Sequence, residues 1–144
     1  MRVIHLDEIP PARIGAASWK PIRSLLDIRS FGVNAYVADA GEALFDEHDE
    51  TEAGAGRQRH QELYVVLAGQ ATFACGSSVV DAPAGTLVFL ENPAERRAAH
   101  ATAPATTVLA VGGPVGEPYE VAPWEGWFLA RRDEQLASYE ERPA

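Results

Sequence analysis

Short runs rich in β-branched and aromatic residues, separated by turn residues such as Gly and Pro, recur through the middle of the sequence. Each run is long enough for one strand. The turn residues return about every ten positions, which is the spacing of an antiparallel sandwich or barrel. We therefore predict an all-β fold with strands at residues 19–28, 32–38, 43–49, 62–69, 70–76, 78–83, 85–91, 96–103 and 106–113.

A helical period is found only near the C-terminus. Pro123 suits the first position of a helix, because its missing N–H would have no partner there. Five apolar or aromatic residues then fall roughly on one face: Trp124, Trp127, Phe128, Leu136 and Tyr139. We expect a short C-terminal helix that packs on the β-structure or on a second subunit.

The chain has 144 residues, of which 47% are hydrophobic, so it can bury a core without disulfides or metal ions as supports. We expect a single domain with three parts: an N-terminal arm with the first strands at 1–30, a barrel at 31–113 and a helical extension at 114–144. The only cysteine, Cys75, has no basic residue close to it in sequence, which indicates a small apolar filler and not a nucleophile.

The charge balance restricts the partners of the protein. Acidic residues outnumber basic residues by 21 to 12, and no segment concentrates Lys and Arg, so nucleic acid is not an expected partner. The N-terminal residues contain no apolar run long enough for a signal peptide or a membrane span. Because a single cysteine also fits a reducing compartment, we expect a cytoplasmic protein that does not bind membranes.

Residues 46–59 lack apolar periodicity and contain two glycines, so we expect a loop between two strands. The loop is rich in carboxylates, namely Asp46, Glu47, Asp49, Glu50 and Glu52. It lacks the glycine-centred spacing of a calcium loop, and we interpret these carboxylates as solvated. The motifs G-x-S-x-G and H-E-x-x-H are absent from the sequence, which argues against serine hydrolases and zinc proteases of those classes.

Two stretches, ELYVVLAGQATF and VVDAPAGTLVFLENPAERR, resemble the two characteristic motifs of the cupin superfamily, the RmlC-like jelly-roll barrels. Glu62 and Gly69 match the Glu-x6-Gly half of the first motif, and Pro83 and Gly85 match the Pro-x-Gly approach to the second. The resemblance implies a cupin double-stranded β-helix with a short C-terminal helix. It also implies a homodimer whose barrel holds a small molecule.

The sequence departs from the cupin pattern at the metal ligands. The two histidines of the first motif would fall at Ala55 and Arg57, or at Gly56 and Gln58, and neither pair is present. In the second motif, Arg96 stands about where the last histidine ligand would be. A guanidinium carries a fixed positive charge and repels a cation. With three of the four usual ligands missing, the resemblance implies a degenerate metal site.

Other residues of the chain could rebuild a metal site. Side chains two positions apart on a strand face the same side, so His60, Glu62 and Tyr64 share one face. His48 ends the preceding strand, and the set His48, His60 and Glu62 would suit iron(II), manganese or zinc. One difficulty is that Phe45 and His48 fall on opposite faces of a regular strand, so His48 would need a β-bulge to reach the site.

An alternative site needs no metal, because Glu62 could pair with Arg96 or Arg97 as its counter-charge. The expected ligand-binding residues at the barrel mouth are Glu62, His60, Tyr64, Arg96, Arg97 and Phe89. Among them, Tyr64 and Phe89 would line the barrel. An arginine at the mouth would favour an anionic ligand. His100 is either a further member of the cavity or a surface residue.

Three functions therefore stay open, and with them the question whether the chain is an enzyme. The first is a barrel that binds a small, anionic molecule without metal chemistry. The second is a metal-dependent oxygenase or isomerase that uses His48, His60 and Glu62 with Fe, Mn or Zn. The third is a scaffold or interaction protein that acts through its C-terminal helix.

Overall fold

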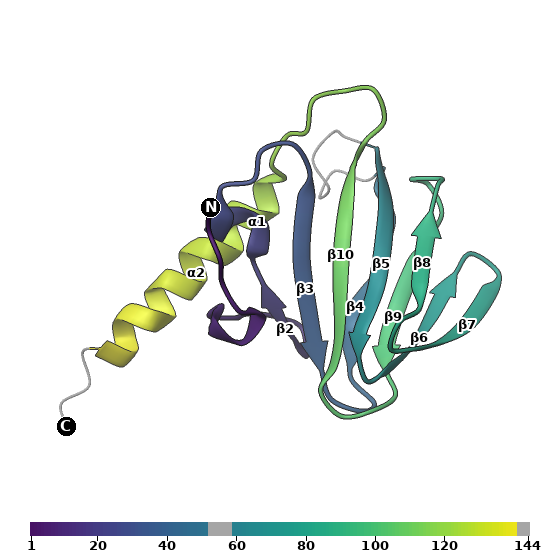
Figure 1. The fold of residues 1–144 in the computed structure, drawn as a ribbon, viewed down its shortest axis with the longest axis horizontal. Helices are drawn as coiled ribbons and strands as arrows, with labels where there is room; N and C mark the ends of the chain where they lie inside the picture. The colour runs from purple at the N-terminus through teal and green to yellow at the C-terminus, as the bar shows by residue number, and fades with distance from the viewer. Residues whose placement is uncertain (52–58, 141–144) are drawn as a thin grey trace.

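The computed structural model describes residues 1–51 and 59–140, with the side chains of the last helix described up to Arg131. Its strands form two antiparallel sheets (Figure 1). One sheet has the order β1-β2-β3-β10-β5-β8 and consists of β1 (Ala12–Ile14), β2 (Ala17–Lys20), β3 (Gly32–Ala38), β10 (Thr106–Pro114), β5 (His60–Ala68) and β8 (Leu87–Leu90). The other has the order β4-β9-β6-β7 and consists of β4 (Ala43–His48), β9 (Arg97–Ala101), β6 (Gln70–Cys75) and β7 (Ser78–Pro83). The helices are η1 (Leu6–Glu8), α1 (Ile22–Leu26) and α2 (Pro123–Glu140).

The core lies between the two sheets, because alternate residues of each strand point inward. On β5, Tyr64 and Val66 are 2% and 1% exposed, and on β6 Phe73 is fully buried. The rings of Phe45 and Tyr64 stack with their centroids 4.9 Å apart and so join the two sheets. Cys75 is buried in the same core, as expected of a small apolar filler. The all-β prediction is thus confirmed.

The prediction of one strand over 19–28 is wrong. Strand β2 ends at Lys20, and the short helix α1 begins directly after Pro21. Proline lacks the N–H that a strand ladder requires, and its restricted φ suits the start of a helix. The helix ends at Leu26, and its C-cap residue Asp27 adopts a left-handed conformation with φ 54°. The three-residue strand β1 was not predicted, because so short a run has no readable period.

Helix α2 packs its first turns against the N-terminal strands and α1. The fully buried ring of Trp19 on β2 lies 5.4 Å from that of Trp124 and 6.2 Å from that of Phe128. Leu136 and Tyr139, which were predicted to share this face, lie outside the described side chains. Trp127 was predicted to share it as well, but its side chain is 55% exposed.

An ion pair with almost no solvent exposure reinforces this packing. The carboxylate of Glu125 lies 2.8 Å from Nη2 of Arg23 on α1 and also accepts a hydrogen bond from its Nε. The start of α2 is therefore held by aromatic packing and by a buried charge pair. Within the described residues, none of the helices combines the length and apolar character that crossing a membrane requires.

Candidate functional site

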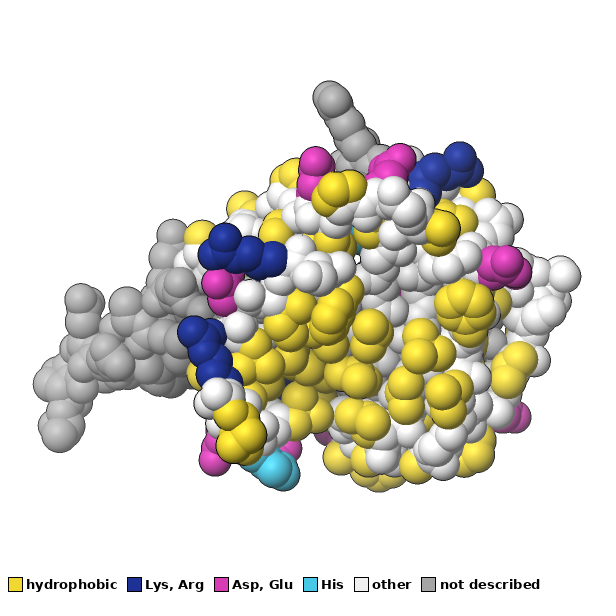
Figure 2. Space-filling view, turned by 45° about the horizontal axis from the view of Figure 1, so that its top comes forward, with side chains coloured by type: hydrophobic (Ala, Val, Ile, Leu, Met, Phe, Trp, Pro, Cys, Tyr) yellow, Lys and Arg dark blue, Asp and Glu magenta, His cyan; other side chains and the backbone are white. Residues whose placement is uncertain are grey.

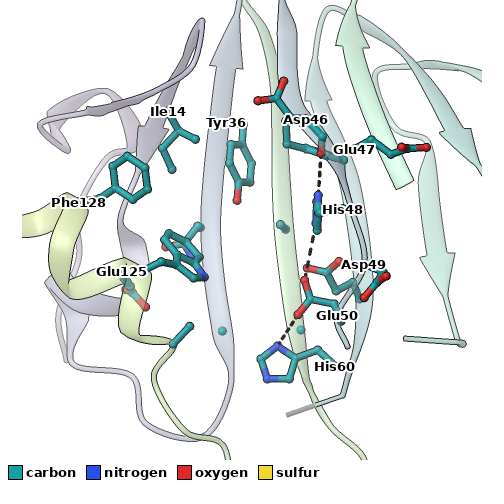
Figure 3. A pocket seen from close by; sticks show the side chains of 18 of the residues that line it. Ile14, Tyr36, Asp46, Glu47, His48, Asp49, Glu50, His60, Glu125 and Phe128 are labelled. Atoms are coloured by element: carbon teal, nitrogen blue, oxygen red, sulfur yellow. Dashed lines mark hydrogen bonds and ion pairs between the residues drawn. The ribbon is translucent and has the colours of Figure 1, made fainter. Parts of the chain in front are cut away.

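An open cavity of about 390 Å³ lies between the inner face of the six-stranded sheet, the end of β4 and the start of α2. Tyr36 of β3 lines it at the sheet (Figure 3). His48 and Glu50 approach it from one side and Phe128 from the other (Figure 3). The cavity thus has one wall rich in carboxylates and imidazoles and one wall that is mainly aromatic.

Strand β5 contributes the residues that its alternation predicts. His60 and Tyr64 are 8% and 2% exposed, and Glu62 between them is partly buried. The Tyr64 hydroxyl donates a hydrogen bond of 2.5 Å to Oε2 of Glu62. Burial and the nearby Glu62 raise the pKa of Tyr64 well above 10, so this hydroxyl keeps its proton. Glu62 is thereby held toward the barrel interior.

A glycine on the neighbouring strand leaves room for Glu62. Gly112 on β10 pairs directly with Glu62. A Cβ atom at position 112 would lie 3.1 Å from Cγ of Glu62 and 3.0 Å from the carbonyl oxygen of Gln61. Any larger side chain would therefore push against the candidate site.

His48 reaches the cavity because β4 is bulged. The pairing of β4 with β9 shifts register between Phe45 and His48, so that Phe45 is opposite Ala99 and His48 opposite Arg97. His48 is three positions after Phe45 on β4, but their partners Ala99 and Arg97 are only two positions apart on β9. The extra residue on β4 turns His48 to the same side as the buried Phe45. The bulge that the sequence required is present.

Glu50, which we interpreted as part of a solvated loop, is buried with 8% exposure. Its N–H donates a hydrogen bond of 2.9 Å to the carbonyl of Pro93, which draws this segment onto the barrel. Burial, together with the nearby charge of Glu62, raises the pKa of Glu50 from 4.5 to about 8. A signal for Glu50 existed in the sequence, because His48 and Glu50 repeat the His-x-Glu spacing of His60 and Glu62.

His48, Glu50 and Glu62 form a group that could hold a metal ion. One ligand atom from each residue lies within 4.8 Å of the other two. Nδ1 of His48 lies 2.8 Å from the carbonyl oxygen of Asp46. Since a carbonyl only accepts, Nδ1 carries the proton and Nε2 keeps its lone pair. This Nε2 atom lies 3.7 Å from Oε1 of Glu50.

His60 is placed beside this group and not within it. Its Nδ1 lies 3.4 Å from Oε2 of Glu50, on the side of the carboxylate away from His48 (Figure 3). The ring also lies 5.5 Å from that of Tyr119. Burial lowers the pKa of His60 below 6.5, so the imidazole is neutral at neutral pH. The structure thus groups Glu50, and not His60, with His48 and Glu62, and the set of His48, His60 and Glu62 stays a prediction.

Comparison with solved structures finds close matches to the two-sheet arrangement. A predicted oxalate decarboxylase from Thermotoga maritima superimposes with a TM-score of 0.62 at 18% identity, over 77% of this chain and 97% of that one. A Klebsiella pneumoniae protein with a double-stranded β-helix domain gives 0.62 at 18% identity, over 85% and 97%. A cupin-superfamily sugar phosphate isomerase from Silicibacter pomeroyi gives 0.61 at 17% identity, over 77% and 74%. This chain has the fold of the cupin superfamily. Neither the protein-family models nor the curated sequences contain a match.

In this cupin-type barrel, Arg97 and not Arg96 pairs with Glu62. Arg97 is fully buried, and its Nε lies 3.3 Å from Oε2 of Glu62. The side chain of Arg96 is 46% exposed and pairs with Glu47 at 3.2 Å and with Asp49 at 3.9 Å. Arg96 therefore does not line the cavity, contrary to our expectation. Arg96 lies directly before β9 and Arg97 is its first residue, and only the buried Arg97 reaches the carboxylate.

Two other expected cavity residues lie on the outside of the cupin barrel. Phe89 is 59% exposed and faces away from the core, so the prediction that it lines the barrel is wrong. It lies opposite Leu63 on β5, one position out of phase with the inward pair Tyr64 and Val88. His100 is exposed on β9 and is a surface residue. The positions of the first cupin motif's histidines, Ala55 and Arg57 or Gly56 and Gln58, lie outside the described residues, as does Glu52.

Proposed function

We propose that this cupin binds one divalent metal ion through His48, Glu50 and Glu62 and presents it to a small uncharged molecule in the adjacent cavity. The observation that carries the proposal is the convergence of these three ligand atoms, each within 4.8 Å of the others, at the wall of a cavity of about 390 Å³. One imidazole and two carboxylates suit manganese, iron(II) or zinc.

The donor chemistry of the three residues fits a cation. The hydrogen bond from His48 Nδ1 to the carbonyl of Asp46 orients the ring and leaves Nε2 as a donor, which is the usual outer-shell arrangement of a metal-binding histidine. Both polar contacts of Glu62, with Tyr64 and with Arg97, are made by Oε2. Among the described residues, none occupies Oε1 with a hydrogen bond or an ion pair.

The electrostatics of the site favour a cation as well. The buried carboxylate of Glu50 and the partly buried carboxylate of Glu62 share the positive charge of one buried guanidinium, Arg97. This imbalance is resolved by a proton on Glu50, whose pKa is raised to about 8. A divalent cation would replace that proton and relieve the repulsion between the two carboxylates.

The charge of the cavity supports an uncharged ligand. Its described lining contains the carboxylates of Asp46, Glu47, Asp49, Glu50, Glu62 and Glu125, and no Lys or Arg. Two structural relatives are named as a predicted oxalate decarboxylase and a sugar phosphate isomerase, and both names refer to anionic compounds. A phosphate or dicarboxylate in this cavity would meet six carboxylates and, apart from the proposed metal ion, no Lys or Arg of the described lining to offset them. The anionic ligand that Arg96 would have favoured is therefore not the one we propose.

Other groups in the cavity indicate how an uncharged ligand could be held. Oδ1 of Asn34 is buried and has no hydrogen-bond partner, so a ligand hydroxyl could donate to it. The aromatic wall around Trp124 and Phe128 offers apolar contact to the opposite side of the ligand. A compact polyhydroxy compound matches both features.

The reaction class that these residues support is proton transfer on a hydroxy-carbonyl compound, as in an isomerisation. The bound metal would supply Lewis-acid polarisation of a ligand oxygen. His60 lines the cavity and is neutral at neutral pH, so it can accept a proton as a general base. Glu50, at 3.4 Å from His60, stabilises the imidazolium that forms.

A second candidate is a barrel that binds a small molecule without metal. The observation in its favour is the contact of 3.3 Å between Arg97 and Glu62, since the guanidinium already supplies one buried counter-charge. Metal content distinguishes the two candidates.

The experiment for the metal site compares variants of adjacent carboxylates. Protein stripped with a chelator, reloaded with Mn(II) and dialysed should retain about one ion per chain, as measured by elemental analysis. Glu50→Gln and His48→Ala should each weaken Mn(II) affinity at least about tenfold. Glu47→Gln, a 64% exposed carboxylate of the cavity lining that is not one of the three proposed ligands, should bind as wild type. Equal retention by wild type and Glu50→Gln, or no retention by either, would refute the metal site.

The experiment for the ligand class uses matched probes. Glucose and glucose 6-phosphate differ by one charged group, so their effects on the melting temperature of Mn(II)-loaded protein can be compared directly. We expect a larger upward shift with glucose. A larger shift with the phosphate would show that the ligand is anionic and would leave the metal site standing.

A further inference from the structure

We propose that the end of the cavity remote from the proposed metal ligands binds a small methylated ammonium ion, held by the carboxylate of Asp46 and by three aromatic rings. The rings are those of Tyr36, Trp124 and Phe128, which line the cavity together with Asp46. This ion would be a separate ligand from the uncharged molecule at the metal. The site needs no metal, so it can be tested independently of the proposed function.

Asp46 differs from the other carboxylates of the cavity lining. Each of the other five contacts at least one cationic, imidazole or hydroxyl group: Glu47, Asp49, Glu50, Glu62 and Glu125. Within the described residues, no hydrogen bond or ion pair involves the carboxylate of Asp46. Its exposed negative charge is therefore available to a cation from solution.

The turn between β1 and β2 connects this carboxylate with the aromatic wall. A Cβ atom at position 15, which is Gly15, would lie 3.9 Å from Oδ2 of Asp46. The preceding residue, Ile14, lines the cavity, and α2 packs on its strand β1. Figure 3 shows Ile14 and Phe128 on one side of Tyr36 and Asp46 on the other. The carboxylate and the rings thus surround the same end of the cavity.

The aromatic rings supply the second part of the recognition. The rings of Trp124 and Phe128 are partly exposed, lie 5.9 Å apart and are inclined at 76°, so they form a corner. The ring of Tyr36, on the sheet, adds a third aromatic surface. A cation within about 6 Å of the centre of such a ring is attracted by its π electrons, and Trp gives the strongest attraction.

The charge of the protein favours a cation at this site. The described lining of the cavity contains no Lys or Arg, and the whole chain has a net charge of −9. On the face shown in Figure 2, the Lys and Arg side chains stand apart from one another near the margins and form no positive patch. A cleft of one charge sign concentrates ions of the opposite sign, so cations accumulate here.

The groups around Asp46 fit a methylated ammonium better than a metal ion or a primary amine. A hard metal ion takes several oxygen ligands, whereas this end of the cavity offers one unpaired carboxylate. A primary ammonium has three N–H donors, which a single carboxylate does not satisfy. The methyl groups of a methylated ammonium would instead contact Ile14 and the aromatic rings, which is how proteins commonly recognise quaternary ammonium ligands.

The cavity has room for this ion beside a second small ligand. In Figure 3, His48, Glu50 and His60 follow one another away from Asp46, so these residues lie toward the other end of the cavity. Cavities of about 300 Å³ already hold drug-sized ligands. A cavity of about 390 Å³ therefore accepts two smaller molecules.

Choline and 3,3-dimethyl-1-butanol test the proposal, because they have nearly the same shape and differ in the charge of the central atom. Isothermal titration calorimetry at constant ionic strength should show saturable binding of choline. Its affinity should be at least about tenfold higher than that of the neutral alcohol. The result should be the same in Mn(II)-loaded and in chelator-stripped protein.

Three variants locate the bound ion. Asp46→Asn should weaken choline binding at least about tenfold and leave the melting temperature unchanged, because this side chain is exposed and unpaired. Glu47→Gln is the matched control, since this neighbouring carboxylate already pairs with Arg96, and it should bind choline as wild type. Phe128→Leu keeps an apolar side chain and removes the ring, so it should weaken choline binding but not binding of the neutral alcohol.

Several outcomes would overturn the proposal. Equal affinities for choline and the neutral alcohol, or no saturable binding of choline, would show that this end of the cavity does not recognise a cation. Choline binding that is unchanged by Asp46→Asn would place the ion elsewhere. Binding only to Mn(II)-loaded protein would make choline a ligand of the metal and would refute a separate site. Retention of Mn(II), which tests the proposed function, is measured without choline.

Discussion

The rings of Phe45 and His48 meet edge to face with centroids 5.5 Å apart, and both face the cavity although three positions separate them on β4. A regular strand would send them to opposite sides. The bulge against β9 brings them to one side, so a residue of the core and a candidate metal ligand occupy the same face. The same segment then carries Glu50 inward, where its side chain is buried.

The stability of the metal-free protein should fall as the pH rises from 6.5 to 8.5. The pKa of Glu50 is about 8 in the folded state and 4.5 in the reference state, so the folded protein holds a proton that the unfolded chain has released. Stability therefore decreases with pH in this window, by on the order of a few kcal/mol in total from pH 4.5 upward. The melting temperature of wild type should drop accordingly.

The pH range from 6.5 to 8.5 avoids the titration of His60, which would change the stability in the opposite direction. His60 has a lowered pKa, so its contribution to stability is lost as the pH falls below 6.5. Glu50→Gln should remove most of the slope between pH 6.5 and 8.5, whereas Glu47→Gln should keep it. The same slope in wild type and Glu50→Gln would show that another group titrates.

Arg97→Met should lower the free energy of unfolding by about 3–5 kcal/mol in denaturant titrations. The substitution leaves the partly buried Glu62 without its counter-charge beside Glu50. The neighbouring Arg96→Met is the control, because the Arg96 side chain is 46% exposed and its closer partner Glu47 is 64% exposed, so the loss should be less than about 1 kcal/mol.

A double variant identifies the cause of that loss. Arg97→Met combined with Glu62→Gln should recover much of the stability, since the unpaired charge is then removed. A double variant as unstable as Arg97→Met alone would show that packing, and not charge, accounts for the effect.

Gly112→Ala should destabilise the protein by about 1–3 kcal/mol and weaken Mn(II) binding. The added methyl group would lie 3.1 Å from Cγ of Glu62, so either this side chain or the strand must move. Gly113→Ala is a matched control, because its nearest neighbour would be Cβ of Phe31 at 4.0 Å. If the two variants have equal free energies of unfolding and equal Mn(II) affinities, the crowding that we infer at position 112 is contradicted.

Trp124→Ala should lower the free energy of unfolding by about 3 kcal/mol, because its ring covers the fully buried Trp19. Trp127→Ala, three positions along the helix and 55% exposed, should change it by less than about 1 kcal/mol. Thermal and urea unfolding measure both. A larger loss of stability with Trp127→Ala than with Trp124→Ala would mean that α2 is an added element that docks partners, as one of our three sequence-based hypotheses held.

The strands were predictable because their signal is local. Most predicted runs coincide with observed strands, and the alternation on β5 correctly placed His60, Glu62 and Tyr64 on the inner face. Phe89 was misplaced because both faces of β8 carry apolar residues, and hydrophobicity alone does not distinguish a core face from an exposed one.

Local sequence signals were enough to place most strands along the chain and to give the inward direction of Glu62, since turn residues separate the strands and side chains alternate along each of them. Tertiary contacts were needed to show that Glu50 lies beside His48 and that Arg97, not Arg96, pairs with Glu62. These choices depend on the register between β4 and β9, where one extra residue reverses the direction of every following side chain. Register is set by pairing between distant segments, and no period within a single strand encodes it.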